Sequence, residues 1–183
     1  MMVTYTGKRF DPTCLSSDMI DIRDIAHALA LQCRFGGHCQ AFYSVAEHSV
    51  RVAQVLDATG FNATVVLQGL LHDASEAYLM DIPKPIKVHL PEYRDLERHV
   101  QSTIYQTFGL PADMPASVHW ADMTMLVTES RDLMADRGRG WGIQATPLPD
   151  PVYPHTTAEA EAMFLAKFEF YTAFRNAGGA DAR

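Results

Sequence analysis

The chain has 183 residues, of which 48% are hydrophobic and 20% are charged. This length is typical of one domain, and the composition excludes a disordered chain. The net charge of −7 gives no general attraction to nucleic acid polymers or to anionic membranes. No uncharged run approaches the roughly 20 apolar residues that a membrane span needs. Three cysteines without a paired zinc pattern, and an N-terminus without an apolar signal core, indicate a cytoplasmic protein.

Most of the chain shows the spacing of apolar residues that indicates helices. Before the first helix, weak alternation indicates an N-terminal arm or a short hairpin over residues 1–20. A stretch with three glycines and four prolines predicts a long loop over 136–155. The expected helices span residues 21–33, 44–57, 62–79, 92–108, 116–135 and 156–176. We therefore expect residues 1–183 to form a single all-α domain, a bundle of about five to seven helices.

Capping residues and helix breakers set several of these boundaries. Capping-box spacing that starts at Ser44 and again at Thr156 opens the second and the last helix. Asn62 can cap the third helix, and Pro83 and Pro85 prevent it from continuing.

Several polar residues do not fit a plain helical bundle, because each lies on, or directly after, a strongly apolar helix. They are His48, His72, Asp73, Glu76, Asp81 and Asp122. Burying an imidazole beside a carboxylate costs several kcal/mol unless something compensates the two groups, and a divalent cation would compensate both. Any one of these histidines alone is better explained as a hydrogen-bonded core residue. The joint pattern of two histidines and two aspartates favours a metal site, because so many buried polar groups cannot stay uncompensated.

The chemistry of these side chains narrows the kind of site. Imidazole and carboxylate ligands suit Mn, Fe, Co, Ni or Zn, and several carboxylates with open water positions favour a hydrolytic site. Arg34 and His38 bracket a Gly-Gly turn, and Lys84 and Lys87 follow Asp81. Cations beside a metal suggest an anionic substrate such as a phosphate ester. The two lysines could equally be solvated loop charges.

With these residues in place, the sequence resembles the HD-domain metal-dependent phosphohydrolases. Their pattern is a His on one helix, a His-Asp pair on a later helix and a distant Asp, which correspond here to His48, His72-Asp73 and Asp122. The longer run LLHDASEA followed by DIPKPIK is similar to the small nucleotide phosphohydrolases of this superfamily. One branch contains bacterial deoxyribonucleoside 5′-monophosphatases, and the other contains phage-type dATP triphosphohydrolases. The stretch IDIRDIAHALALQCRFGGHCQAFYSVAEHS looks closer to the second branch, and the likeness covers roughly residues 20–135.

The resemblance implies an HD-domain bundle and a role for each matched residue. The two histidines and two aspartates would hold the first of one to three divalent ions (Mn, Co, Zn, Mg, Fe or Ni). Glu76 would orient or activate the attacking water or hold a second ion, and Asp81 would assist as an acid. Arg34, Phe35 and His38 would form a substrate loop with Arg34 on the phosphate, and Phe35 stands where some relatives carry Trp.

The function implied by this resemblance is hydrolysis of a deoxynucleotide at its α-phosphate. A dATP-type triphosphohydrolase that releases deoxynucleoside and tripolyphosphate is our first expectation, and a deoxyribonucleoside 5′-monophosphatase is the alternative. A catalytically silent nucleotide-binding regulatory module is a further alternative. A di-iron oxygenase would need additional histidine ligands at a convincing spacing, and a cyclic-dinucleotide phosphodiesterase would show a Gly-Tyr-Pro sequence that is missing.

The composition and the resemblance together also predict the partners and the location of the protein. We expect a deoxynucleotide substrate, neither a nucleic acid polymer nor a membrane as partner, and a homo-oligomer (dimer or hexamer). We expect the protein to act in the bacterial cytosol or, for a phage protein, in the cytosol of the host.

Overall fold

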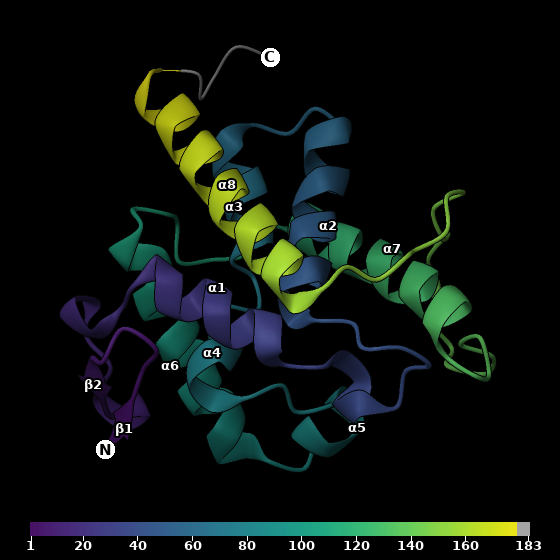
Figure 1. Cartoon of the computed structure of the whole chain (residues 1–183), viewed down its shortest axis with the longest axis horizontal. Coiled ribbons are helices and arrows are strands. Elements are labelled where there is room, and N and C mark those ends of the chain that lie inside the picture. Colours follow the sequence, from purple (N-terminus) through teal and green to yellow (C-terminus); the bar gives the residue numbers. More distant parts are fainter. Residues whose placement is uncertain (179–183) are drawn as a thin grey trace.

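The computed structural model describes residues 1–178, which contain eight α-helices and one two-stranded sheet (Figure 1). The helices are α1 (Ile22–Leu31), α2 (Val45–Ala58), α3 (Ala63–Leu70), α4 (Glu76–Leu79), α5 (Lys84–Lys87), α6 (Pro91–Thr107), α7 (Ala116–Leu133) and α8 (Thr157–Asn176). The strands are β1 (Met2–Val3) and β2 (Arg9–Phe10), which pair antiparallel. The predictions of an all-α fold and of an N-terminal hairpin are both confirmed.

Helix α2 lies in the middle of the bundle. It packs against α1, α3, α7 and α8, and α8 crosses over α1, α2 and α3 (Figure 1). Ten of the fourteen residues of α2 are buried, including Val52 and Leu56 of the core and the polar residue His48. A polar side chain at the centre of such a helix needs partners from neighbouring elements.

The predicted caps open their helices, with one difference. Both halves of the capping box form at α8, between Thr156 and Glu159. At α2, the side chain of Ser44 accepts a hydrogen bond from the amide of Glu47, but the carboxylate of Glu47 does not return one. That carboxylate instead binds Arg51 at 2.8 Å and the backbone amide of His155 at 2.8 Å. Glu47 thereby ties the end of the long loop to α2.

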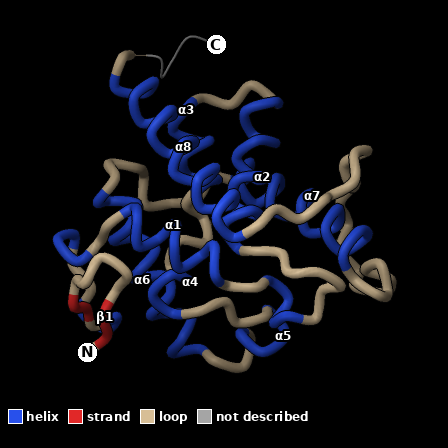
Figure 2. The backbone as a smooth tube through the Cα atoms, in the orientation of Figure 1, coloured by secondary structure: helices blue, strands red, loops and turns tan. Residues whose placement is uncertain are grey.

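The loop predicted over 136–155 is present, and Figure 2 shows it as a tube without helix or strand between α7 and α8. It is held against α7 by two backbone amides. Leu148 donates to the Thr128 hydroxyl at 2.9 Å, and Val152 donates to the Asp132 carboxylate at 2.8 Å. The loop is therefore fixed along part of its length.

The predicted helix over 62–79 is divided into α3 and α4. In an unbroken helix the amide of Ser75 would pair with the carbonyl of Leu71. The side chain of Gln101, from α6, lies between these two groups: its Oε1 accepts from the Ser75 amide at 3.0 Å, and its Nε2 donates to the Leu71 carbonyl at 2.7 Å. A side chain inserted into the helical hydrogen-bond ladder is a known cause of a break.

The number of helices therefore exceeds the predicted five to seven. The break separates α4 from α3, and the proline-rich segment forms the short helix α5. Pro85 lies in the first turn of α5, where a missing amide hydrogen costs nothing. None of the helices within residues 1–178 is both long enough and apolar enough to cross a membrane.

Candidate metal centre

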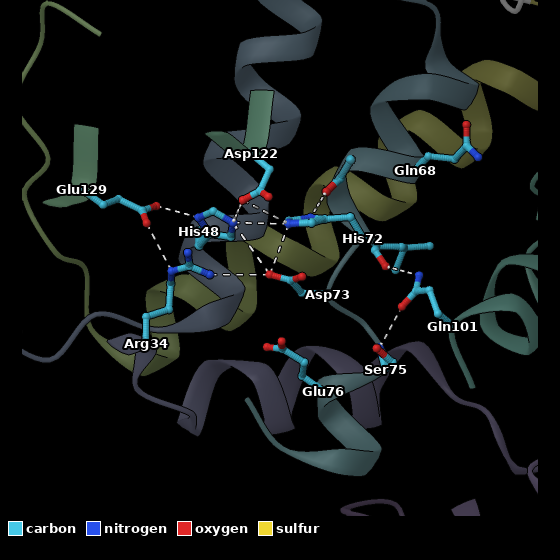
Figure 3. Close-up of polar contacts among 12 residues, drawn as sticks. Arg34, His48, Gln68, His72, Asp73, Ser75, Glu76, Gln101, Asp122 and Glu129 are labelled. Carbon is cyan, nitrogen blue, oxygen red and sulfur yellow. Dashed lines mark hydrogen bonds and ion pairs between the residues drawn. The ribbon is translucent and has the colours of Figure 1, made fainter. Parts of the chain in front are cut away.

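The four predicted metal ligands meet at one point in the interior (Figure 3). Helix α2 supplies His48, the turn after α3 supplies His72 and Asp73, and α7 supplies Asp122. His48 Nε2 lies 3.3 Å from His72 Nε2 and 3.2 Å from Asp122 Oδ1. Asp73 Oδ2 lies 3.2 Å from His72 Nε2 and 3.8 Å from His48 Nε2. One ligand atom each from His48, His72 and Asp122 lies within 4.8 Å of the others, so this group could hold a metal ion.

In both histidines the hydrogen bond to a neighbouring residue is made by Nδ1, so Nε2 is the nitrogen that faces the cluster and is available to a metal. His72 Nδ1 lies 2.8 Å from the carbonyl oxygen of Gly69. A carbonyl only accepts hydrogen bonds, so Nδ1 carries a proton and Nε2 is the nitrogen that can bind a metal once it is deprotonated. His48 Nδ1 lies 2.7 Å from Glu129 Oε1, which orients that ring in the same way. Metal-binding histidines in proteins are held by such partners on the second nitrogen.

The spacing of the ligand atoms also fits a bound ion. Ligand atoms bound to one ion at about 2.1 Å, in tetrahedral or octahedral arrangement, lie about 3.0–3.4 Å apart. The distances between His48 Nε2 and His72 Nε2 (3.3 Å), and between His48 Nε2 and Asp122 Oδ1 (3.2 Å), fall in this range. The side chains present therefore fit a divalent cation.

Negative charge exceeds positive charge around this point. The carboxylates are Asp73, Glu76, Asp81, Asp122 and Glu129, and the nearest cations are Arg34 and Lys87. Burial, together with the nearby carboxylates Asp73 and Asp81, raises the pKa of Glu76 well above its usual range. Glu76 Oε2 is buried and has no hydrogen-bond partner among the described residues. A buried carboxylate oxygen without a hydrogen-bond partner and a surplus of negative charge are both consistent with a cation site.

The pKa of His48 reflects the same excess of negative charge. Burial by itself would lower the pKa of this imidazole, and the Arg34 guanidinium acts in the same direction. The carboxylates of Glu129 and Asp122 outweigh both and raise the pKa of His48 to about 9.

Glu129 is the important residue that sequence reasoning missed. It is fully buried, and its Oε1 accepts hydrogen bonds from Tyr43 at 2.8 Å and from His48 at 2.7 Å. Its Oε2 lies 3.2 Å from Arg34 Nε. Burial alone would raise the pKa of Glu129, but His48 and Arg34 outweigh it and lower the pKa. The available signal was its position on α7, seven residues and therefore two turns after Asp122, on the same face.

Replacing Glu129 with Gln is expected to weaken Mn²⁺ binding by about 10–100-fold, the usual effect of losing an outer partner of a metal-binding histidine. The protein should also unfold at a lower temperature, because the charge of Arg34 is buried against Glu129. Isothermal titration with Mn²⁺ and a thermal melt measure the two effects. Glu169→Gln, at an exposed position of α8, is the matched control. Unchanged Mn²⁺ affinity in Glu129→Gln would show that His48 does not depend on this carboxylate.

Gln101 is a second positioning residue for the site. By breaking the helix between Leu71 and Ser75, it frees His72 and Asp73 from the angle of about 100° that separates neighbouring residues of a helix. Both side chains then reach the same point, with His72 Nε2 and Asp73 Oδ2 3.2 Å apart.

We expect Gln101→Leu to lower Mn²⁺ affinity by about 10–100-fold, because His72 and Asp73 lose the turn that directs them. Gln106→Leu changes an exposed glutamine of the same helix and should leave the affinity at the wild-type value. Equal affinities in the two variants, measured by the same titration, would exclude the proposed role of Gln101.

A cavity of about 810 Å³ lies beside the metal-ligand cluster. The side chains that line it include His72, Asp73 and Asp122 of the cluster and the basic residues Lys87, Arg94 and Arg98. Its volume is in the range typical of small-molecule sites, about 300–1,000 Å³. Most of the other lining residues belong to α6, which sequence reasoning did not assign to the site.

The predicted substrate residues differ in how close they lie to the cluster. Arg34 Nη1 lies 3.5 Å from Asp73 Oδ2, and its guanidinium lies over the ring of Phe35 at 5.3 Å. Lys87 lines the cavity and lies 3.6 Å from Glu76 Oε1. Lys84 and His38 are exposed, and within residues 1–178 neither has a hydrogen bond or ion pair to the cluster.

Asp81 and Phe35 lie at the edge of the site. Asp81 is half-buried, and its amide donates to Gln32 Oε1 at 3.0 Å. Burial and the charge of Asp73 raise the pKa of Asp81. Phe35 has a positive φ of 58°, which is strained for a residue other than glycine, and its ring lies 6.0 Å from that of Trp141.

Comparisons with known proteins identify relatives without assigning an activity. No family model matches the chain. It is 40% identical over 169 residues to the uncharacterized protein YfdR of Escherichia coli, a match that covers 90% of this chain and 92% of that protein. It is 36% identical over 118 residues to an uncharacterized protein of Rhodobacter capsulatus, covering 62% of this chain and 60% of that protein.

Proposed function

The chain belongs to the same family as the uncharacterized Escherichia coli protein YfdR, and we propose that it is a metal-dependent phosphohydrolase of the HD-domain type that acts on deoxynucleotides. One observation carries this proposal. His48, His72, Asp73 and Asp122, from three separate parts of the chain, converge beside a cavity of about 810 Å³. The three free cysteines support a cytoplasmic location for this activity.

The proposed cofactor is a divalent ion such as Mn, Co, Zn, Mg, Fe or Ni, held by these four side chains. When bound, it supplies a Lewis acid for a phosphate oxygen and lowers the pKa of water. The two imidazole and two carboxylate ligands are compatible with these metals, and four protein ligands with open positions for water favour an octahedral hydrolytic site over a closed zinc site.

Glu76 is proposed to accept the proton of the attacking water. Its Oε2 is buried and without a hydrogen-bond partner among residues 1–178, and burial beside Asp73 and Asp81 raises the pKa of this carboxyl, which makes it a stronger base than an ordinary glutamate. Lys87 Nζ lies 3.6 Å from the other oxygen, Oε1, and holds the carboxylate in place.

Arg34 and Asp81 are proposed to act on the phosphate and on the leaving group. The Arg34 guanidinium lies 3.5 Å from Asp73, where it can offset charge on the non-bridging phosphate oxygens. The water oxygen forms a bond to the α-phosphorus, and the bond from phosphorus to the sugar O5′ breaks. Asp81, whose raised pKa favours its protonated form, donates the proton that O5′ takes up.

A triphosphate is the preferred substrate in this proposal because the cavity extends to cations beyond the cluster. Lys87 pairs with Glu97, and Arg98 pairs with Asp95 at 3.0 Å. Arg94 has no ion-pair partner among residues 1–178, so it is available to the terminal phosphates. A monophosphate would leave this part of the cavity empty.

The experiment is to identify the products from all four dNTPs and all four dNMPs in the presence of Mn²⁺, Co²⁺, Zn²⁺ or Mg²⁺. Deoxynucleoside and tripolyphosphate from a dNTP are the expected products. Orthophosphate released from a dNMP would favour the 5′-monophosphatase instead. Thermal stabilisation by nucleotides without any release would indicate a silent binding module, and it would contradict the roles given to Glu76 and Asp81.

A further inference from the structure

Two of the three cysteines lie side by side in the turn that carries Arg34. The sulfur atoms of Cys33 and Cys39 are 3.5 Å apart, and both residues are half-buried free thiols. The third cysteine, Cys14, is exposed and lies on a separate turn near the N-terminus. We propose that Cys33 and Cys39 are an oxidisable dithiol, a modification site at which a peroxide forms a reversible disulfide that controls Arg34.

The backbone already brings the two cysteines together. Positive φ angles at successive residues fold the chain back between them: 58° at Phe35, 59° at Gly36 and 79° at Gly37. Cys39 Sγ donates to the carbonyl of Arg34 at 3.7 Å, and Cys33 forms an isolated β-bridge with Ser44. A disulfide needs a sulfur separation of about 2.05 Å, so the two sulfurs have to approach by about 1.5 Å.

The proposed reaction consumes one peroxide for each disulfide. One cysteine thiol releases its proton, and the thiolate attacks an oxygen of hydrogen peroxide; the O–O bond breaks, a sulfenic acid forms, and the departing hydroxide takes up the released proton to give one water. The second thiol attacks the sulfur of the sulfenic acid, forms the S–S bond and releases a second water. Peroxide is reduced and the two thiols are oxidised, so electrons and atoms balance. A dithiol reductant reverses the reaction by thiol–disulfide exchange.

Arg34 connects this modification to the metal centre. It follows Cys33 directly, and its guanidinium lies 3.2 Å from Glu129 Oε2 and 3.5 Å from Asp73 Oδ2. Drawing the sulfurs together moves the backbone on both sides of Arg34, because the disulfide closes a small ring that contains it. The guanidinium then leaves the position from which it faces the cluster.

The two parts of the proposal rest on different grounds. Formation of the disulfide depends only on the geometry of Cys33 and Cys39. The effect on turnover rests on the proposed phosphohydrolase function, in which Arg34 binds the phosphate.

Peptide mapping of the full-length protein tests the disulfide directly. Trypsin cleaves after Arg34, so Cys33 falls in the peptide 24–34 and Cys39 in the peptide 35–51. After treatment with hydrogen peroxide we expect these two peptides to be linked, with an intact mass about 2 Da lower than before. Dithiothreitol should separate the peptides again. Cys14→Ser should behave like the wild-type protein, whereas Cys33→Ser and Cys39→Ser should give no linked peptides.

Turnover of a dNTP with Mn²⁺, before and after oxidation, tests the control of Arg34. We expect oxidation to lower turnover by about 100-fold, the scale of losing one charge-stabilising donor. The Cys33→Ser variant should stay active in peroxide.

The two measurements can fail separately. Sulfinic acid without a linked peptide, or links only through Cys14, would overturn the modification site. A linked peptide with unchanged turnover would overturn the control of Arg34. If the reduced protein hydrolyses no nucleotide at all, the proposed function fails while the linked peptides still establish the dithiol.

Discussion

Replacing Asp73 with Ala is expected to abolish metal binding and hydrolysis together. Its Oδ2 lies 3.2 Å from His72 Nε2, 3.8 Å from His48 Nε2 and 3.5 Å from Arg34 Nη1. The substitution removes the carboxylate of Asp73, which is both a proposed metal ligand and the negative charge beside His48 and His72. The loss of Mn²⁺ affinity should be larger than the loss of about 10–100-fold that follows when a hydrogen-bond partner of a metal-binding histidine is changed. Titration with Mn²⁺ and a product assay measure the two losses.

An exposed carboxylate that lines the same cavity provides the control for Asp73→Ala. The side chain of Asp95 lines the cavity, is 72% exposed and pairs with Arg98. Asp95→Ala should bind Mn²⁺ as the wild-type protein does, because an exposed pair contributes little. If Asp73→Ala retained stoichiometric Mn²⁺ and wild-type turnover, the ion would have to be held elsewhere.

Replacing Glu76 with Gln is expected to leave metal binding intact and to lower turnover by about 10²–10⁴-fold, the usual contribution of a general base. Gln keeps the size of the side chain but cannot accept a proton at neutral pH. Turnover at saturating substrate and Mn²⁺ is the deciding measurement, with Mn²⁺ titration as its companion. Wild-type turnover in Glu76→Gln would exclude Glu76 as the base.

The stability of the metal-free protein provides a second test of Glu76. Because burial raises its pKa in the folded state, the folded protein holds this proton more tightly than the unfolded chain does. Stability that depends on the proton is present below the unfolded pKa of about 4.3 and is lost as the pH rises toward the folded pKa. Glu76→Gln is therefore expected to be more stable than the wild-type protein at pH 7 and to lose this advantage near pH 4. An advantage that persisted unchanged at low pH would contradict the burial of an ionisable group here.

Local signals in the sequence predict most of the fold. Helical spacing and caps such as Asn62 and Thr156 depend on neighbouring residues only, and they identified five of the six expected helices as single elements. The division of the remaining helix, which was expected over residues 62–79, could not be predicted in this way. It depends on Gln101, which lies 30 residues beyond Leu71 in the chain and reaches it only after α6 has packed.

The candidate site shows the same limit. Polar residues in apolar helices were sufficient to predict that His48, His72, Asp73 and Asp122 belong to one cluster, because an uncompensated polar group is unusual in such a pattern; their role as metal ligands stays a prediction. Glu129 was missed because its partners, Arg34 and His48, lie far away in the sequence. The outward position of Lys84 and His38 could not be predicted, since Lys84 begins the short helix α5 and His38 follows a tight turn, and the direction of both segments depends on tertiary packing. The homo-oligomer, and the absence of nucleic acid and membrane partners, stay predictions.

The measurement that tests the account most directly is a crystal structure of the protein with Mn²⁺ and a slowly hydrolysed dNTP analogue, recorded with anomalous diffraction from manganese. We predict an anomalous peak about 2.0–2.3 Å from His48 Nε2, His72 Nε2 and the carboxylates of Asp73 and Asp122, with the α-phosphate bound beside it. A peak at another position, or a nucleotide whose α-phosphate lies away from these four side chains, would contradict it.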